Sequence, residues 1–138
     1  PYLFYLKINS LKKFKKSNDF KKLINSYKRP VNILISEEKK NKDLISDEPL
    51  IELFEKKDEQ ALYKKLIKVE KEVKNSIQNQ DFKPALISLA SFDNEIENFF
   101  KNVVINVDNT NIKTNRLKLC NKVRKIMHSV AYFGHLNV

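Results

Sequence analysis

The sequence has one glycine, one cysteine, one methionine and no tryptophan, and these shortages exclude several classes of protein. One glycine and four prolines in 138 residues leave few positions for tight turns, which argues against a small all-β domain. The single cysteine, Cys120, can form no internal disulfide and excludes a cysteine-based zinc site. No apolar run reaches the roughly 20 residues of a membrane-spanning helix. We therefore expect an all-α, cytoplasmic domain.

Groups suited to catalysis are also scarce. The only two histidines, His128 and His135, have no acidic residues beside them, and Cys120 falls on the apolar side of its expected helix. The sequence contains no glycine-rich phosphate loop and no HExxH pattern. We predict that this segment holds no catalytic residue, no metal ion and no cofactor.

Apolar residues recur every three or four positions along most of the chain, which is the period of an α-helix. The pattern predicts helices over Tyr2–Lys16, Asn18–Leu34, Pro49–Phe54, Asp58–Gln78, Phe82–Val107 and Ile112–Tyr132. We expect an antiparallel bundle of five to six helices that forms a single domain over residues 1–138. Because the first residue is Pro1, we also expect a piece cut from a longer chain.

Local breakers and caps refine these boundaries. Pro30 predicts a kink or break near Lys28–Arg29, because proline inside a helix costs about 3 kcal/mol. The polar, aperiodic residues 36–49 predict a surface loop without a functional role. Asp58 and Asp81 are the expected N-caps, a bend is expected at residues 91–94, and the last helix should stop at Gly134.

Charge is distributed unevenly within a net charge of +10. Residues 1–30 carry nine Lys or Arg and one acid, residues 31–60 carry five and nine, and residues 108–138 carry six and one. The two basic ends could form one wall for a phosphate backbone, or they could be the solvated surface of a lysine-biased chain. Arginine suits phosphates and base edges better than lysine, so Arg29, Arg116 and Arg124 are the first candidates for contact.

Exposed aromatic residues could stack on bases. The phase of the doublet Phe99-Phe100 assigns both rings to the core instead, whereas Tyr27 and Tyr132 lie nearer to basic residues and are the better candidates.

The C-terminal part of the chain contains a distinctive set of residues: Phe82, Ala85, Leu86, the doublet Phe99-Phe100, Val103, Val107, Asp108 and the motif Asn115-Arg116-Leu117. With these residues Ala85–Leu136 resembles the C-terminal anticodon-binding domain of the bacterial glycyl-tRNA synthetase β subunit, a DALR-like helical domain. Upstream, Tyr27–Leu34 is similar to the family's Lys-Arg-Val-x-Asn-Ile element. Pro30 and the ending AYFGHLNV depart from the family pattern.

The resemblance implies a non-catalytic domain that binds the anticodon arm of glycine tRNA. The parent enzyme would be a glycine–tRNA ligase that needs ATP and Mg²⁺ and works with a catalytic α subunit in an α2β2 complex. The expected tRNA-binding residues are Lys28, Arg29, Asn32, Asn115, Arg116, Lys122 and Arg124. For Arg116 a structural alternative is open, namely an ion pair with a carboxylate such as Asp108. A helical protein-interaction module and the related domain of an arginyl-tRNA synthetase are the other candidates for the chain.

Overall fold

The computed structural model describes residues 18–41, 45 and 47–135, which form helices and short connections with no β-strand among them. The elements are α2 (Asn18–Asn41), the short 3-10 helix η1 (Ile51–Leu53), α3 (Lys57–Gln78), α4 (Phe82–Ala90), α5 (Asp93–Asn102) and α6 (Thr110–His135). The predicted all-α fold is confirmed. The helix expected over Tyr2–Lys16 lies outside the described residues.

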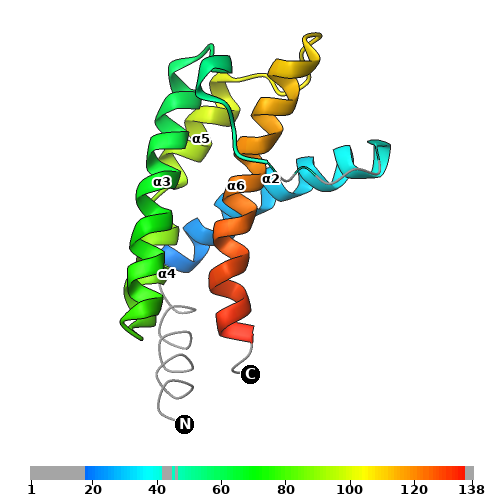
Figure 1. The fold of residues 1–138 in the computed structure, drawn as a ribbon. Helices are drawn as coiled ribbons and strands as arrows, with labels where there is room; N and C mark the ends of the chain where they lie inside the picture. Colours follow the sequence, from blue (N-terminus) through cyan, green and yellow to red (C-terminus); the bar gives the residue numbers. More distant parts are fainter. Residues whose placement is uncertain (1–17, 42–44, 46, 136–138) are drawn as a thin grey trace.

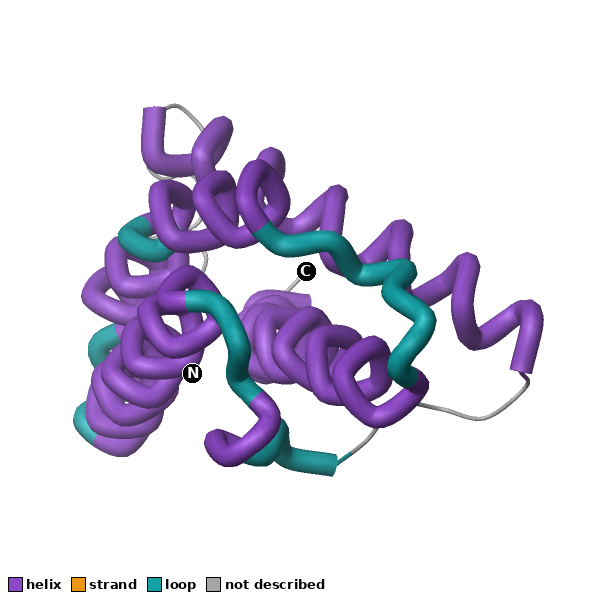
Figure 2. Tube along the Cα trace, turned by 90° about the horizontal axis from the view of Figure 1, so that it is seen from above, coloured by secondary structure: helices purple, strands orange, loops and turns teal. Residues whose placement is uncertain are grey.

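The helices form an antiparallel bundle with one crossing member. In Figure 1, α3 runs down one side, α4 and α5 return along it, and α6 runs down the other side. Figure 2 looks down α3 and α6, and it shows that α2 lies across one side of this group instead of parallel to it. Helix α2 packs against α6, α4 and α5, which places its outer surface along one side of the domain.

One continuous core joins the helices. Its largest fully buried side chains are Phe92, Phe99, Leu34, Leu62, Leu66, Leu89 and Leu119. All of them belong to the apolar stripes that the period of three and four predicted, because that period keeps a row of side chains on one face of each helix. Truncation of a buried phenylalanine to alanine in such a core costs about 3–5 kcal/mol.

Helix α2 continues through Pro30 from Asn18 to Asn41. Of the predicted kink or break near Lys28–Arg29, the break is therefore wrong and the kink stays a prediction. Proline removes one backbone hydrogen bond, but Pro30, Val31 and Leu34 are all buried against the neighbouring helices. Burial of this face stabilises the helix enough to offset the cost of the proline.

The predicted loop over residues 36–49 is also wrong in its first part, since Ser36–Asn41 form the last turns of α2. These turns are held by ion pairs with α6. The carboxylate of Glu37 lies 3.3 Å from Lys113 Nζ, and that of Glu38 lies 2.8 Å from Arg124 Nη2. Polar residues without an apolar period were therefore kept helical by long-range charge pairing.

Helix α3 begins at Lys57, and Asp58 is not its cap. The Glu59 carboxylate instead turns back and accepts the backbone N–H groups of Lys56 and Glu55, both at 2.8 Å. This is the return half of a capping box. The helix ends where predicted, at a turn in which Gln80 has a positive φ of 57°.

The predicted helix over Phe82–Val107 is two helices, because α4 ends at Ala90 and α5 begins at Asp93. Asp81 occupies the expected N-cap position of α4 but makes no side-chain capping bond. After α5 the chain is extended from Val103, so Val107 lies outside any helix.

Helix α6 begins two residues earlier than predicted and extends past Gly134 to His135, so Gly134 is not its cap. Asn109 supplies the cap at the other end, where its side-chain oxygen accepts the N–H groups of Asn111 at 3.0 Å and Ile112 at 3.2 Å.

Candidate nucleic-acid interface

The outer face of α2 carries a band of exposed cations and amides. It consists of Lys21, Lys22, Asn25, Lys28, Arg29 and Asn32, all exposed. At 3.6 residues per turn these six positions occupy about 120° of the helix circumference. None of the four cations forms an ion pair with a carboxylate in the part of the chain that the structure describes. We call these six residues the α2 face.

Arg29 has an aromatic neighbour instead of an acidic one. Its guanidinium carbon lies 4.9 Å from the centroid of the Phe100 ring, at the contact between α2 and α5. Phe99 is fully buried, as predicted, but Phe100 is only half-buried. The two rings meet edge to face at 5.1 Å, so Phe99 holds Phe100 at the margin of the core. The prediction that both rings belong to the core is thus confirmed for Phe99 and only partly correct for Phe100.

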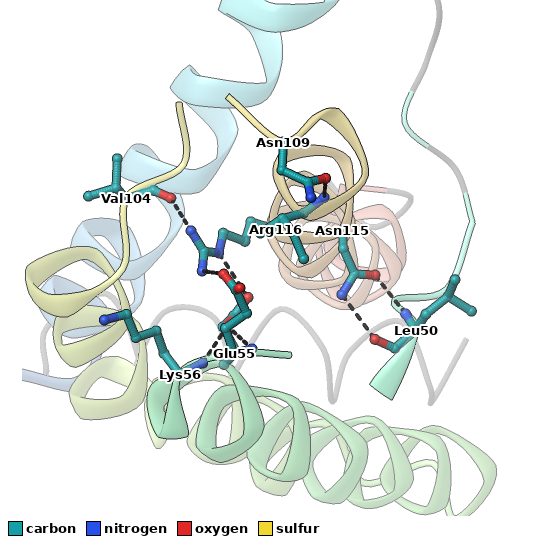
Figure 3. A network of polar contacts seen from close by, with 9 residues as sticks. Leu50, Glu55, Lys56, Val104, Asn109, Asn115 and Arg116 are labelled. Atoms are coloured by element: carbon teal, nitrogen blue, oxygen red, sulfur yellow. Dashed lines mark hydrogen bonds and ion pairs between the residues drawn. The ribbon is translucent and has the colours of Figure 1, made fainter. Parts of the chain in front are cut away.

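Asn115 and Arg116 point into the protein (Figure 3). The side-chain oxygen of Asn115 accepts the Leu50 N–H at 2.7 Å, and its amide donates to the Leu50 carbonyl at 3.0 Å. Asn115 is 1% exposed and Arg116 is 2% exposed. Both side chains join α6 to the segment that precedes α3.

The Arg116 guanidinium uses three groups from elsewhere in the fold. Its Nε donates to Glu59 at 2.9 Å, its Nη2 to Glu55 at 3.2 Å, and its Nη1 to the Val104 carbonyl at 2.7 Å. Arg116 therefore forms an ion pair within the protein, which is the structural alternative to RNA contact. Its partners are Glu59 and Glu55 and not Asp108. The capping-box signature did not point to Glu59, because the N-cap residue is Lys56 and not Ser or Thr.

Lys122 is likewise buried, and its Nζ lies 2.8 Å from Glu48 and 3.3 Å from Glu70. Burial alone lowers the pKa of Lys122, but hydrogen bonds and charge attraction from Glu48 and Glu70 outweigh that effect and raise it. The ammonium group therefore stays charged in its protein environment.

Arg124 forms a two-pronged pair with Glu38 of α2, at 2.9 and 2.8 Å. The hydrogen bond from Arg124 lowers the pKa of Glu38, although burial opposes the shift. The same hydrogen bond raises the pKa of Arg124. Close by on these helices, Tyr27 and His128 share a hydrogen bond of 2.8 Å, whereas the Tyr132 side chain lies outside the described part of the chain.

The seven predicted contact residues thus fall into two groups. Lys28, Arg29 and Asn32 lie together on the exposed α2 face. Asn115, Arg116, Lys122 and Arg124 lie along α6 and bind protein groups. Three further residues of the α2 face, Lys21, Lys22 and Asn25, are not among the seven, although their helical spacing from Lys28, Arg29 and Asn32 indicates that they share that face.

Catalytic groups are not assembled in the described residues. The Cys120 thiol is buried, and that burial raises its pKa to about 12. Among residues 18–41, 45 and 47–135 no three metal-binding side chains cluster, and no helix is long and apolar enough to cross a membrane. An all-α fold with exposed cations and amides along one helix face is typical of a helical nucleic-acid-binding module.

The chain belongs to the DALR anticodon-binding domain family, which matches residues 23–133. It is 35% identical to the glycine–tRNA ligase β subunit of Buchnera aphidicola subsp. Acyrthosiphon pisum (strain Tuc7) over 94% of this chain and 18% of that protein. The β subunits of Phenylobacterium zucineum (strain HLK1) and Rickettsia peacockii (strain Rustic) are 33% and 32% identical, again over 94% of this chain and 19% of theirs. The resemblance seen in the sequence is confirmed. The chain spans about a fifth of the length of these relatives.

Proposed function

We propose that this chain is the anticodon-binding domain of a glycine–tRNA ligase β subunit and binds the anticodon arm of glycine tRNA. The aminoacylation reaction, with its ATP and Mg²⁺, would take place elsewhere in the parent enzyme, in a catalytic α subunit of an α2β2 complex. Such an enzyme works in the cytoplasm, where its tRNA substrate is found. The named relatives support the assignment to this ligase, and the family supports the anticodon arm as the ligand.

The observation that carries the proposal is the contrast between the α2 face and α6. Cations that serve only to stabilise a fold are paired with carboxylates, as Arg116, Lys122 and Arg124 are. The cations of the α2 face remain open to solvent on one side of a helix, interleaved with amide side chains. Lysine and arginine in this arrangement bind phosphates, and amides can hydrogen-bond to bases.

We assign direct RNA contact first to Lys28, Arg29 and Asn32. For the four α6 residues, contact with tRNA stays a prediction, and their protein partners favour a positioning role. Arg124 and Lys113 bind the last turns of α2, so α6 orients the helix that carries the α2 face.

Binding to a hairpin RNA with the glycine anticodon loop tests the proposal. The wild-type protein should bind this hairpin more tightly than one of equal length with an unrelated anticodon. Its affinity should fall as salt rises, because phosphate contacts release counterions. Lys28→Ala should weaken binding because it removes about one phosphate contact. The slope of log affinity against log salt concentration should then become less negative by about 0.7, the value for one contact with a single strand.

Lys68→Ala is the matched control, since Lys68 is an exposed lysine on α3 without an ion pair to a described residue. It should bind as the wild type does. Equal losses in both variants, with no preference among hairpins, would contradict the proposal and favour a helical interaction module whose lysines attract any polyanion. A preference for an arginine anticodon would favour the related arginyl-tRNA synthetase domain.

A further inference from the structure

The three arginines of the chain are held in two different ways. Arg116 and Arg124 donate hydrogen bonds to carboxylates, so the N–H edge of each guanidinium is already occupied. Arg29 lies instead over the Phe100 ring, with its guanidinium carbon 4.9 Å from the ring centroid. None of its N–H groups donates to a protein acceptor within the described residues. The donors of Arg29 are therefore open to a ligand.

The contact lies at a cleft of about 310 Å³ between α2 and α5, at one edge of the α2 face. Asp93 and Glu97 line the same cleft, and neither forms an ion pair with Arg29 in the part of the chain that the structure describes. A carboxylate would bind the guanidinium through its N–H groups, whereas an aromatic ring attracts the cation through its π face. The ring therefore holds Arg29 at α5 without using the groups that bind phosphate.

Phe100 is fixed in turn by the core. It is half-buried, and it meets the fully buried Phe99 edge to face at 5.1 Å. An exposed arginine without a fixed neighbour samples many rotamers, and ordering it on a ligand costs conformational entropy. A ring that is anchored in the core restricts the Arg29 side chain before the ligand arrives.

The lysines of the α2 face lack such a support. Lys21, Lys22 and Lys28 make no contact with an aromatic ring among the described residues. Each is an exposed ammonium group on a flexible four-carbon stem. Within the described structure, Arg29 is thus the cation of this face that a core residue of another helix positions.

We propose that Phe100 is a positioning residue for RNA binding. It holds the guanidinium of Arg29 in place on the α2 face, so that the arginine binds a phosphate with little further ordering. Phe100 acts through Arg29 and makes no contact with RNA itself, because Arg29 already covers its ring. The inference rests on the proposed function, in which the α2 face binds the anticodon arm. It gives the second ring of the Phe99-Phe100 doublet a role beyond packing.

A double-mutant cycle tests this role. Binding of the hairpin with the glycine anticodon loop is measured at one salt concentration for the wild type, Phe100→Leu, Arg29→Ala and the double variant. Phe100→Leu should weaken binding about 2- to 10-fold, which corresponds to the ordering of one long side chain on binding. In the Arg29→Ala protein the same substitution should change the affinity no further, because the side chain that Phe100 positions is absent.

Lys28→Ala is the matched background, since Lys28 precedes Arg29 on the α2 face and has no ring contact with a described residue. In this protein Phe100→Leu should weaken binding by the same factor as in the wild type. Phe100→Tyr keeps the ring beneath Arg29, and it should bind the hairpin as the wild type does.

Phe54→Leu controls for the loss of a half-buried ring in general. Phe54 packs edge to face on Tyr63 of α3, and no ring contact or hydrogen bond joins it to Arg29 in the described structure. This variant should be destabilised but keep wild-type RNA binding. Circular dichroism must show that each variant is folded, and Phe100→Met replaces Phe100→Leu in the cycle if the leucine variant is not.

Equal losses on Phe100→Leu in the wild-type and Arg29→Ala backgrounds would overturn the positioning role, because they would show that Phe100 acts without Arg29. Wild-type affinity in a folded Phe100→Leu protein would overturn it as well. Either result would leave the proposed function intact. A wild-type protein that bound no hairpin would overturn both.

Discussion

Arg116 of α6 donates from Nε to Glu59 of α3 at 2.9 Å, and the two side chains are 3% and 0% exposed. The second oxygen of the same carboxylate accepts two backbone N–H groups at the start of α3. One buried glutamate therefore caps α3 and neutralises the arginine that joins α6 to it. The fold itself therefore gives this arginine of the Asn115-Arg116-Leu117 motif a structural role.

Arg116→Ala should lower the free energy of unfolding by about 3–5 kcal/mol, because it leaves the buried Glu59 charge without its partner. Urea unfolding followed by circular dichroism measures the change. The double variant Glu59→Gln with Arg116→Met should be less destabilised than Arg116→Ala alone. It leaves no unpaired buried charge, and the glutamine oxygen can still cap α3.

Arg29→Ala is the matched comparison, since this arginine is exposed on the α2 face. It should change the unfolding free energy by less than about 0.5 kcal/mol, as surface substitutions usually do, and weaken binding of the anticodon hairpin. The reverse result, a stable Arg116→Ala that binds RNA poorly and an Arg29→Ala that binds normally, would return the contact role to Arg116.

Asn115→Ala should cost about 1–3 kcal/mol of stability, because it leaves the backbone N–H and C=O of Leu50 without their partner. The measurement is again the urea midpoint. Asn111→Ala, at an exposed position on the first turn of α6, should be close to neutral. Equal stability of the two variants would mean that water replaces the Asn115 amide.

Much of the fold follows from local pattern. The apolar period placed α3 and the cores of α2 and α6, because a buried helix face must repeat every three or four residues. Polar residues at a turn fixed the end of α3 at Asn79–Asp81. The bend expected at residues 91–94 marks the place where α4 and α5 separate, but the pattern predicted one continuous helix there, since Phe92 and Ile96 keep the apolar phase across the split.

The contact residues were harder to predict for an electrostatic reason. From charge alone, the two basic ends of the chain are expected to form one phosphate-binding surface, and the acidic middle is expected to take no part in it. In the fold, Glu37, Glu38, Glu48, Glu55 and Glu59 of that acidic segment bind cations of the basic α6. Only long-range packing decides which cations pair with these carboxylates. Composition could therefore not show that Lys28 and Arg29 stay exposed while Arg116 and Lys122 form buried ion pairs.

Acid should weaken the domain partly through Glu38. Because Arg124 holds the pKa of Glu38 below its ordinary value of 4.5, ionised Glu38 stabilises the native state above that pH. The contribution is lost as the pH falls through the lowered pKa. Glu38→Gln should therefore be less stable than the wild type at about pH 7, and the two urea midpoints should converge as the pH falls through the lowered pKa of Glu38.

Glu52→Gln serves as the control for this titration, since Glu52 is exposed and has no ion-pair partner among the described residues. Its midpoint should follow that of the wild type across the whole pH range. A difference between Glu38→Gln and the wild type that stayed constant from neutral pH into acid would show that the pair stabilises by packing and not by charge.

Cys120 should report unfolding of the core. Its thiol is buried and has a pKa of about 12, so at about pH 8 only about one molecule in ten thousand carries the reactive thiolate. A disulfide reagent should label the native protein slowly, at a rate that rises with urea in step with the unfolded fraction. Cys120→Ala should take up no label, since it removes the only cysteine. Rapid labelling without urea would mean that α6 opens locally, and the Arg116→Ala variant, which weakens the attachment of α6, should then label faster still.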